Sequence, residues 1–87
     1  MKDITMFMMK TCPYCQAAFR MMDKLYSENE AYKTLTVNLI DETEHPEIAN
    51  KYDYYRVPTY YVGEEKLHEG AANITDVKRV FDTALTS

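Results

Sequence analysis

The sequence lacks several features that would assign it to a familiar class of protein. It has no run of about 18 apolar residues, the length that crosses a membrane, so we expect no transmembrane segment and no membrane partner. Its first residues lack a long apolar stretch and a small-residue cleavage site, which argues against a signal peptide and favours the cytoplasm. Without repeats or low-complexity segments, the 87 residues predict one domain, residues 1–87.

Positive charge is also scarce. The chain has 10 Lys and Arg side chains against 14 Asp and Glu side chains, and its formal net charge is −4. A general nucleic-acid-binding protein would show a basic stripe, so we expect no nucleic-acid partner. The stretch YDYYRVPTYYV is rich in tyrosine, but with one Arg its composition favours packing in a core or groove over stacking on bases.

Cysteine is rare as well: the only two cysteines, Cys12 and Cys15, both lie in the sequence TCPYC. A disulfide between them would close a very short loop and stabilise the fold little, so a structural role is the weakest explanation. A zinc site needs four ligands, and only His45 and His68, without ligand-like spacing, could complete it. Redox chemistry is the favoured interpretation. A metal or iron–sulfur module that uses the same thiols, including a cluster bridged between two chains with glutathione, is the alternative.

The remaining sequence alternates between strand and helix patterns. Residues 3–9 are apolar at both alternations, which is typical of a buried central strand. Apolar residues then recur at helical spacing from Pro13 to about residue 29, and proline is well tolerated in the first turn of a helix. The cysteine pair would therefore lie between the carboxyl end of a strand and the N-terminus of a helix, where open α/β sheets place their sites.

The next segment predicts a second strand and a second helix. Residues 34–40 alternate apolar with polar positions, so we expect a strand with one apolar face, formed by Leu35, Val37 and Leu39. A strand–helix–strand unit of this kind is normally a right-handed parallel crossover. A helix is expected over residues 46–54, with proline again in its first turn.

The C-terminal third predicts a β-hairpin and a final helix. TYYV and EKLHEG read as two strands joined by a tight turn at Gly63, and the last helix is expected to begin near Asn73 or Thr75. The predicted order is β-α-β-α-β-β-α. This is an α/β protein with a mixed sheet of about four strands and three helices.

The position of the cysteines predicts different roles for them. A helix N-terminus stabilises negative charge, so the thiol of Cys12 is expected to ionise readily, with a pKa of about 4–7 as in comparable C-x-x-C sites. Lys10 is expected to add positive charge, and so is Arg56 if its loop folds against the site. Cys15 would be more buried on the same helix face, which suits the thiol that resolves a mixed disulfide.

TCPYC after a short buried strand, followed by VPT at residues 57–59 and by a glycine before the last helix, resembles the glutaredoxin branch of the thioredoxin superfamily. The resemblance covers essentially the whole chain and implies a thioredoxin-like fold. It implies that Cys12 attacks a disulfide, that Cys15 resolves the intermediate and that Pro58 is cis. The peptide before a cis-proline can pair with an extended substrate through the backbone of Val57.

The resemblance also implies a set of substrate-binding residues. Positions that contact glutathione in the family are matched by Lys10, Tyr14 and Val57, and the expected substrate-binding set is Lys10, Pro13, Tyr14, Arg56, Val57, Pro58 and Asn73. Glutaredoxins usually carry two glycines and an acidic pair where the last helix begins, whereas this chain has the sequence GAANI at residues 70–74. Electrons from thioredoxin reductase are therefore the alternative to electrons from glutathione and glutathione reductase.

We therefore expect a thiol–disulfide oxidoreductase that serves electron transport and cell redox homeostasis. Its substrates would be disulfide-containing proteins or glutathione mixed disulfides. No bound cofactor or metal is expected, because the cysteine pair is itself the redox group, with glutathione as a reductant. We expect a monomer.

Overall fold

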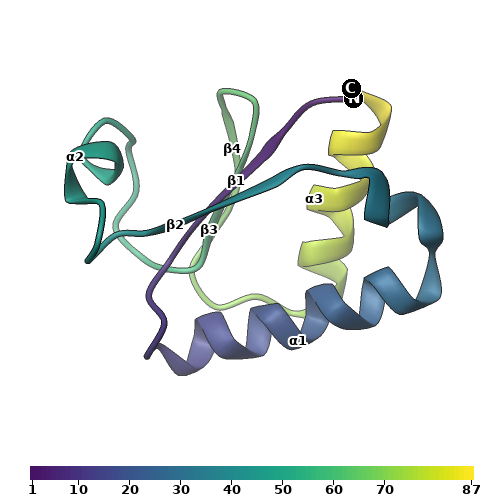
Figure 1. The fold of residues 1–87 in the computed structure, drawn as a ribbon, viewed down its shortest axis with the longest axis horizontal. Helices are drawn as coiled ribbons and strands as arrows, with labels where there is room; N and C mark the ends of the chain where they lie inside the picture. The colour runs from purple at the N-terminus through teal and green to yellow at the C-terminus, as the bar shows by residue number, and fades with distance from the viewer.

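The computed structural model describes residues 1–87 and contains one four-stranded sheet. The strands are β1 (Ile4–Met8), β2 (Val37–Asp41), β3 (Thr59–Val62) and β4 (Glu65–Glu69), arranged in the order β2-β1-β3-β4 (Figure 1). β1 pairs in parallel with β2 and antiparallel with β3, and β3 pairs antiparallel with β4. The predicted α/β class, the mixed four-stranded sheet and the element order are confirmed.

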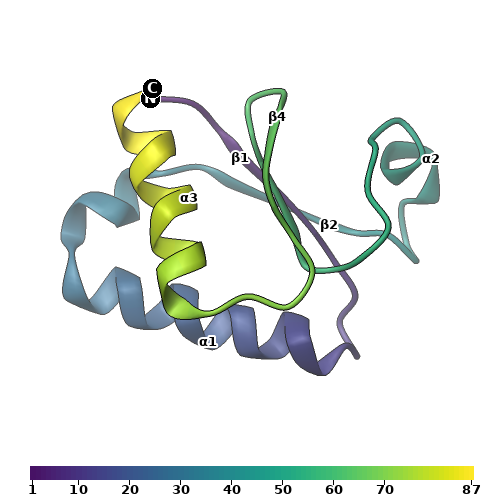
Figure 2. The ribbon, with the colours of Figure 1, turned by 180° about the vertical axis from the view of Figure 1, so that it is seen from behind.

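Three helices and one 3₁₀ segment complete the fold. The helices are α1 (Pro13–Glu28), α2 (Pro46–Ala49) and α3 (Ile74–Thr86), and η1 (Glu30–Thr34) leads from α1 toward β2. α1 and α3 cross each other on one side of the sheet, while α2 lies apart from both (Figures 1 and 2).

The two faces of β1 are buried in two different clusters, as its double apolar pattern predicts. Ile4, Met6 and Met8 point into the larger core formed with α1 and α3. Phe7 points to the other face, where it packs with Tyr61 and with Ala49 of α2. Burial on both faces is what makes β1 the rigid strand from which the TCPYC segment leaves.

Tyrosine rings fill the space between β1, β3 and α2. The ring centroids of Tyr52 and Tyr54 each lie 4.7 Å from that of Phe7, and the ring of Tyr61 lies 5.9 Å from it. These tyrosines pack as the sequence interpretation expected. Tyr55 differs from them, because its side chain is 91% exposed and lines a surface groove, the other place that the sequence interpretation allowed.

Two expectations about the middle of the chain are wrong. The helix expected over residues 46–54 ends at Ala49, and turns follow in which Lys51 N–H donates to the Ile48 carbonyl and Tyr52 N–H to that of Ala49. The ring packing on Phe7 holds the following residues in this irregular path. The strand expected over residues 34–40 is shifted, because residues 30–34 form η1 and β2 spans Val37–Asp41.

The apolar face assigned to this second strand is also only partly correct. Leu35 is buried before β2 begins, and Val37 packs against the main core, but Leu39 is 51% exposed. Leu39 pairs in register with Met6 and so shares its face. β2 is an edge strand, and its outer positions extend beyond the cover that α1 and α3 provide.

The C-terminal hairpin and helix agree with the sequence. Gly63 makes the turn between β3 and β4 with a φ of 58°, a left-handed conformation that glycine adopts without strain. Asn73 is the N-cap of α3: its side chain accepts a hydrogen bond from Asp76 N–H, and the Asp76 carboxylate accepts one from Asn73 N–H. This capping box explains why the helix begins at Ile74.

Candidate functional site

The TCPYC segment lies where β1 ends and α1 begins, as predicted. Cys12 is the N-cap residue of α1, in an extended conformation, and Pro13 occupies the first turn. A turn brings Cys12 N–H to the Met9 carbonyl at 3.1 Å, and the Cys12 carbonyl accepts the first helical hydrogen bond from Gln16 N–H at 3.0 Å. The backbone on both sides of Cys12 is therefore fixed, and its side chain is placed at the positive end of α1.

The two thiols have opposite environments. Cys12 is half-buried and Cys15 is fully buried in the main core, and both are free thiols. Hydrogen bonding to the Cys15 N–H, then to the Cys15 thiol and the Tyr14 N–H, lowers the pKa of Cys12 below its ordinary range, although burial opposes the shift. Burial in the core raises the pKa of Cys15 to about 11. This is the asymmetry expected of a nucleophile and a resolving thiol.

The Cys12 side chain makes no capping hydrogen bond to the first turn of α1. The amide groups that lower its pKa therefore act on the thiolate, which accepts hydrogen bonds far better than a thiol. The stabilisation appears when the proton leaves, which is what a lowered pKa means.

A loop with a cis peptide bond lies beside the cysteines. The Val57–Pro58 bond is cis, as the family resemblance implied, and Pro58 accepts a hydrogen bond from Gly70 N–H at 2.8 Å. The Glu69 carboxylate accepts hydrogen bonds from the backbone N–H groups of Tyr55 and Arg56 at 2.9 and 3.2 Å. The start of this loop is thus fastened to the end of β4.

A groove of about 410 Å³ runs between this loop and the start of α1. It is here called the thiol groove because it lies beside the start of α1, although neither cysteine is among its lining residues. It is lined by Met9, Tyr14, Glu42, Tyr55, Arg56, Val57, Gly70 and Ala71. Tyr14, which is 62% exposed, follows Cys12 by two residues, and Val57 precedes the cis-proline. The structure therefore brings together three of the residues expected to bind substrate: Tyr14, Arg56 and Val57.

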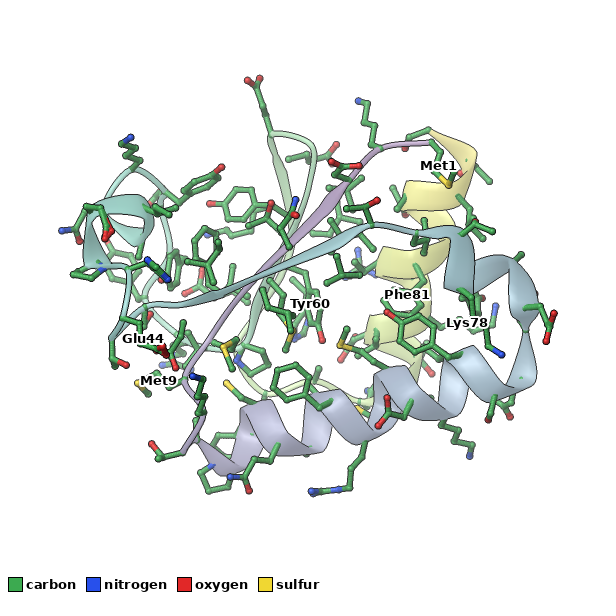
Figure 3. The ribbon with its side chains drawn as sticks, in the orientation of Figure 1. Met1, Met9, Glu44, Tyr60, Lys78 and Phe81 are labelled. Atoms are coloured by element: carbon green, nitrogen blue, oxygen red, sulfur yellow. The ribbon has the colours of Figure 1, made fainter.

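Two other residues of the expected set lie differently. The Lys10 ammonium pairs with the carboxylate of Glu44, which Figure 3 labels, at 2.7 Å. No lysine is among the causes of the lowered pKa of Cys12. Asn73 uses its side-chain oxygen in the cap of α3 and does not line the thiol groove. The positive charge that the sequence predicted for Lys10 is therefore not what lowers the pKa of Cys12.

The sequence interpretation missed Asp41, a buried carboxylate at the end of β2. It accepts hydrogen bonds from the backbone N–H of Lys10 at 3.2 Å and from the backbone N–H of Thr43 at 2.9 Å, and the Thr43 hydroxyl also donates to it. The bond from the Thr43 hydroxyl is the main reason that the pKa of Asp41 lies below its usual range. Asp41 therefore holds the turn that precedes Cys12.

Glu42 was missed as well. Its negative charge raises the pKa of both thiols, and its side chain accepts a hydrogen bond from the Tyr54 hydroxyl at 2.7 Å. Burial and this bond together raise the pKa of Tyr54. One signal was present in the sequence: DETE follows a strand directly, at the sheet edge where parallel strands place functional side chains.

Two further features bear on function. The structure gathers no group of three or more His, Cys, Asp or Glu side chains that could bind a metal ion. None of its helices has the length and apolar character needed to cross a membrane.

Comparison with known proteins gives one family match. The family model described as "Thioredoxin domain" matches residues 2–81, nearly the whole chain. No curated protein sequence matches the chain.

Several solved structures share the fold. Oxidised thioredoxin from Plasmodium falciparum aligns with a TM-score of 0.69 and 18% identity, over 92% of this chain and 77% of that chain. Oxidised thioredoxin O1 from Arabidopsis thaliana aligns with a TM-score of 0.69 and 20% identity, over 94% and 76%. A thioredoxin-like protein from Clostridium perfringens aligns with a TM-score of 0.67 and 23% identity, over 97% and 71%. At these identities the likeness concerns the fold.

Proposed function

The chain belongs to the thioredoxin domain family, and on this premise we propose that it is a dithiol–disulfide oxidoreductase that uses Cys12 and Cys15. One observation carries the proposal. The half-buried Cys12 thiol at the N-terminus of α1 has a lowered pKa, and the fully buried Cys15 thiol one turn later has a pKa raised to about 11. Cys12 ionises more readily and can attack a disulfide as a thiolate, whereas Cys15 stays protonated until the second step.

The reaction proceeds in two exchanges. The Cys12 thiolate attacks one sulfur of a substrate disulfide, forms a mixed disulfide and releases the first substrate thiol, which takes up a proton. Cys15 then loses its proton and attacks Cys12 Sγ, which releases the second substrate thiol and leaves a Cys12–Cys15 disulfide. The substrate gains two electrons and the protein loses two.

Formation of the mixed disulfide itself prepares the second exchange. Burial is the main cause of the raised pKa of Cys15, and hydrogen bonding to Cys12 and the negative charge of Cys12 raise it further. Both contributions disappear once Cys12 is bonded to the substrate, because that sulfur no longer carries a charge. The pKa of Cys15 therefore falls at the step in which its thiolate is required.

We assign substrate binding to the residues around the thiol groove and propose activity of the glutaredoxin type. Tyr14 and Arg56 would flank the substrate, the backbone of Val57 would pair with that of the substrate, and Lys10, Pro13, Pro58 and Asn73 would border the site. The substrates would be disulfide-bonded proteins or glutathione mixed disulfides, reduced in the cytoplasm by a monomer. Glutathione and glutathione reductase would supply the electrons, with no bound cofactor or metal.

A reductant fed by thioredoxin reductase is the second candidate. It is favoured by the single Gly70 before α3 and by Asn73, which stands where glutaredoxins carry an acidic residue. In either case we expect a redox potential between about −270 and −200 mV, the range between thioredoxin and glutaredoxins.

The test compares coupled turnover of a disulfide substrate with each electron donor for the wild type, Cys12→Ser and Cys15→Ser. We expect Cys12→Ser to abolish activity, whereas Cys15→Ser retains activity on glutathione mixed disulfides only. NADPH consumption with glutathione plus glutathione reductase, against thioredoxin reductase, identifies the donor. Full activity of Cys12→Ser with either donor would overturn the proposal.

A further inference from the structure

A second pocket, of about 440 Å³, opens next to the thiol groove. We call it the tyrosine pocket, because Tyr52, Tyr54 and Tyr55 line it together with Glu42 and Pro46. Glu42 and Tyr55 also line the thiol groove, so the two hollows meet at these residues. A chain that lies along the thiol groove can therefore continue into the tyrosine pocket.

The chemistry of the tyrosine pocket suits a cation. Three tyrosines and one glutamate are among its lining residues, and none of the lining residues is Lys or Arg. The Tyr54 hydroxyl holds one oxygen of Glu42 at 2.7 Å, and the second oxygen, Oε2, makes no hydrogen bond within the protein. Aromatic faces attract Lys and Arg side chains, and a carboxylate beside them adds direct charge attraction.

Two of the three rings are held in place before any ligand arrives. Tyr52 and Tyr54 pack on Phe7, with centroid distances of 4.7 Å for both pairs. Tyr55 is 91% exposed, but its backbone N–H is bonded to Glu69 at 2.9 Å, which fixes the point from which its ring projects. A pocket whose walls are already ordered loses little conformational freedom on binding.

Neighbouring charges do not compete for this pocket. The carboxylate of Glu44 is already paired with Lys10 at 2.7 Å. Arg56 lines the thiol groove but not the tyrosine pocket, and it forms no ion pair with Glu42. Glu42 thus supplies the negative charge at the junction of the two hollows.

We propose that the tyrosine pocket binds a Lys or Arg side chain of the disulfide substrate, a few residues from the cysteine that reacts with Cys12. This inference rests on the proposed function, since it names the substrate class of the same thiol pair. It makes the protein selective for cysteines that lie near basic residues in an extended segment. The basic residue would contact the faces of Tyr52 and Tyr55 and the free oxygen of Glu42.

The test uses short peptides that carry one cysteine as a mixed disulfide with a small neutral thiol. An arginine is placed at successive positions on either side of the cysteine, and each peptide is matched by one with citrulline, the neutral analogue of arginine. The reduced protein is mixed with each peptide and the second-order rate of thiol release is measured. At the preferred position we expect the arginine peptide to react at least about fivefold faster than its citrulline match.

Two variants give the test its specificity. Glu42→Gln should bring the arginine-to-citrulline ratio close to one. The ratio is the proper readout, because Glu42 also raises the pKa of both thiols and its removal changes all rates together. Glu47→Gln removes the same charge from exposed α2, outside both hollows, and should leave the ratio unchanged. A ratio near one in the wild type, or a preference that survives Glu42→Gln, would overturn the proposal.

A binding measurement separates this proposal from the proposed function. N-acetyl-arginine amide and its citrulline counterpart carry no sulfur, and their binding to ¹⁵N-labelled protein is followed by amide shifts. We expect the arginine compound alone to shift the amides of Thr43, Asn50 and Tyr55. If no peptide disulfide is reduced but these shifts occur, the redox function fails and the cation pocket stands. If disulfides are reduced without arginine-specific shifts or rate differences, the pocket fails and the redox function stands.

Discussion

The carboxylate of Asp41, at the end of β2, accepts a hydrogen bond of 3.2 Å from the backbone N–H of Lys10, two residues before Cys12. This bond joins the carboxyl ends of two neighbouring parallel strands. It places a buried negative charge beside the turn that precedes Cys12. The position of Cys12 therefore depends on a residue from a distant part of the sequence.

Asp41→Asn tests this dependence through pH. The pKa of Asp41 is lowered in the fold, so its contribution to stability is present above the pKa of the unfolded chain and is lost as pH falls through the folded pKa. We expect the variant to unfold at lower urea concentration than the wild type at pH 7. The difference should shrink at pH values well below the ordinary Asp range of about 3.9. Equal urea midpoints at pH 7 would show that Asp41 does not stabilise the turn.

The pH dependence of alkylation tests the two thiols separately. Cys12 has a lowered pKa, so its reaction with iodoacetamide should reach its maximal rate at lower pH than that of the unfolded chain. Cys15, with a pKa of about 11, should stay unmodified in the folded protein throughout the neutral range. Mass spectrometry of peptides from samples quenched at each pH measures both sites. Earlier labelling of Cys15 than of Cys12 would reverse their assigned roles.

Met6 and Leu39 provide a matched pair for stability. They are register partners on one face of the sheet, but Met6 is fully buried and Leu39 is 51% exposed. We expect Met6→Ala to lower the free energy of unfolding by about 2–5 kcal/mol. Leu39→Ala should change it by about 0.5 kcal/mol or less, because the core does not enclose that side chain. Chemical unfolding of both variants measures the difference, and equal losses would contradict the assignment of β2 as a partly uncovered edge strand.

Asn73 tests whether glutathione is the electron donor. Asn73→Asp keeps an oxygen for the cap of α3 and adds the carboxylate that glutaredoxins carry near this point. If glutathione binds as the family resemblance implies, kcat/KM for glutathione should rise about tenfold through the new charged hydrogen bond. Asn73→Ala is the control: it should lower stability by about 1 kcal/mol without that gain. An unchanged kcat/KM for glutathione in Asn73→Asp would favour the other donor.

The parts of the fold that depend on neighbouring residues in the chain were predictable from sequence. The double apolar pattern of β1, the position of Cys12 at the start of α1 and the glycine turn at Gly63 all depend on local chemistry. Leu39 shows the limit of such patterns. Alternation says which side chains share a face, but the crossing of α1 and α3 decides how far that face is covered.

The candidate site, too, could be predicted from the sequence only in part. The asymmetry of Cys12 and Cys15 follows from helix geometry, since an N-cap is solvated and the next turn faces the core. The partners of Asp41 and Glu42 depend on how a loop of turns folds back over the sheet, and no local pattern specifies that path. Lys10 shows the same limit, because its place in the sequence beside Cys12 does not reveal that its ammonium pairs with Glu44.

The two ends of the chain meet at the side of the molecule opposite the start of α1 (Figure 1). The amino group of Met1 donates to the carbonyl of Ser87, and Lys2 N–H donates to the carbonyl of Ala84 at 3.1 Å. A tag, a surface tether or a fused reporter at either end would therefore project away from Cys12. A short linker between the ends would give a circular protein in which the end that carries Cys12 stays unobstructed, and cyclisation would limit the freedom of the unfolded chain.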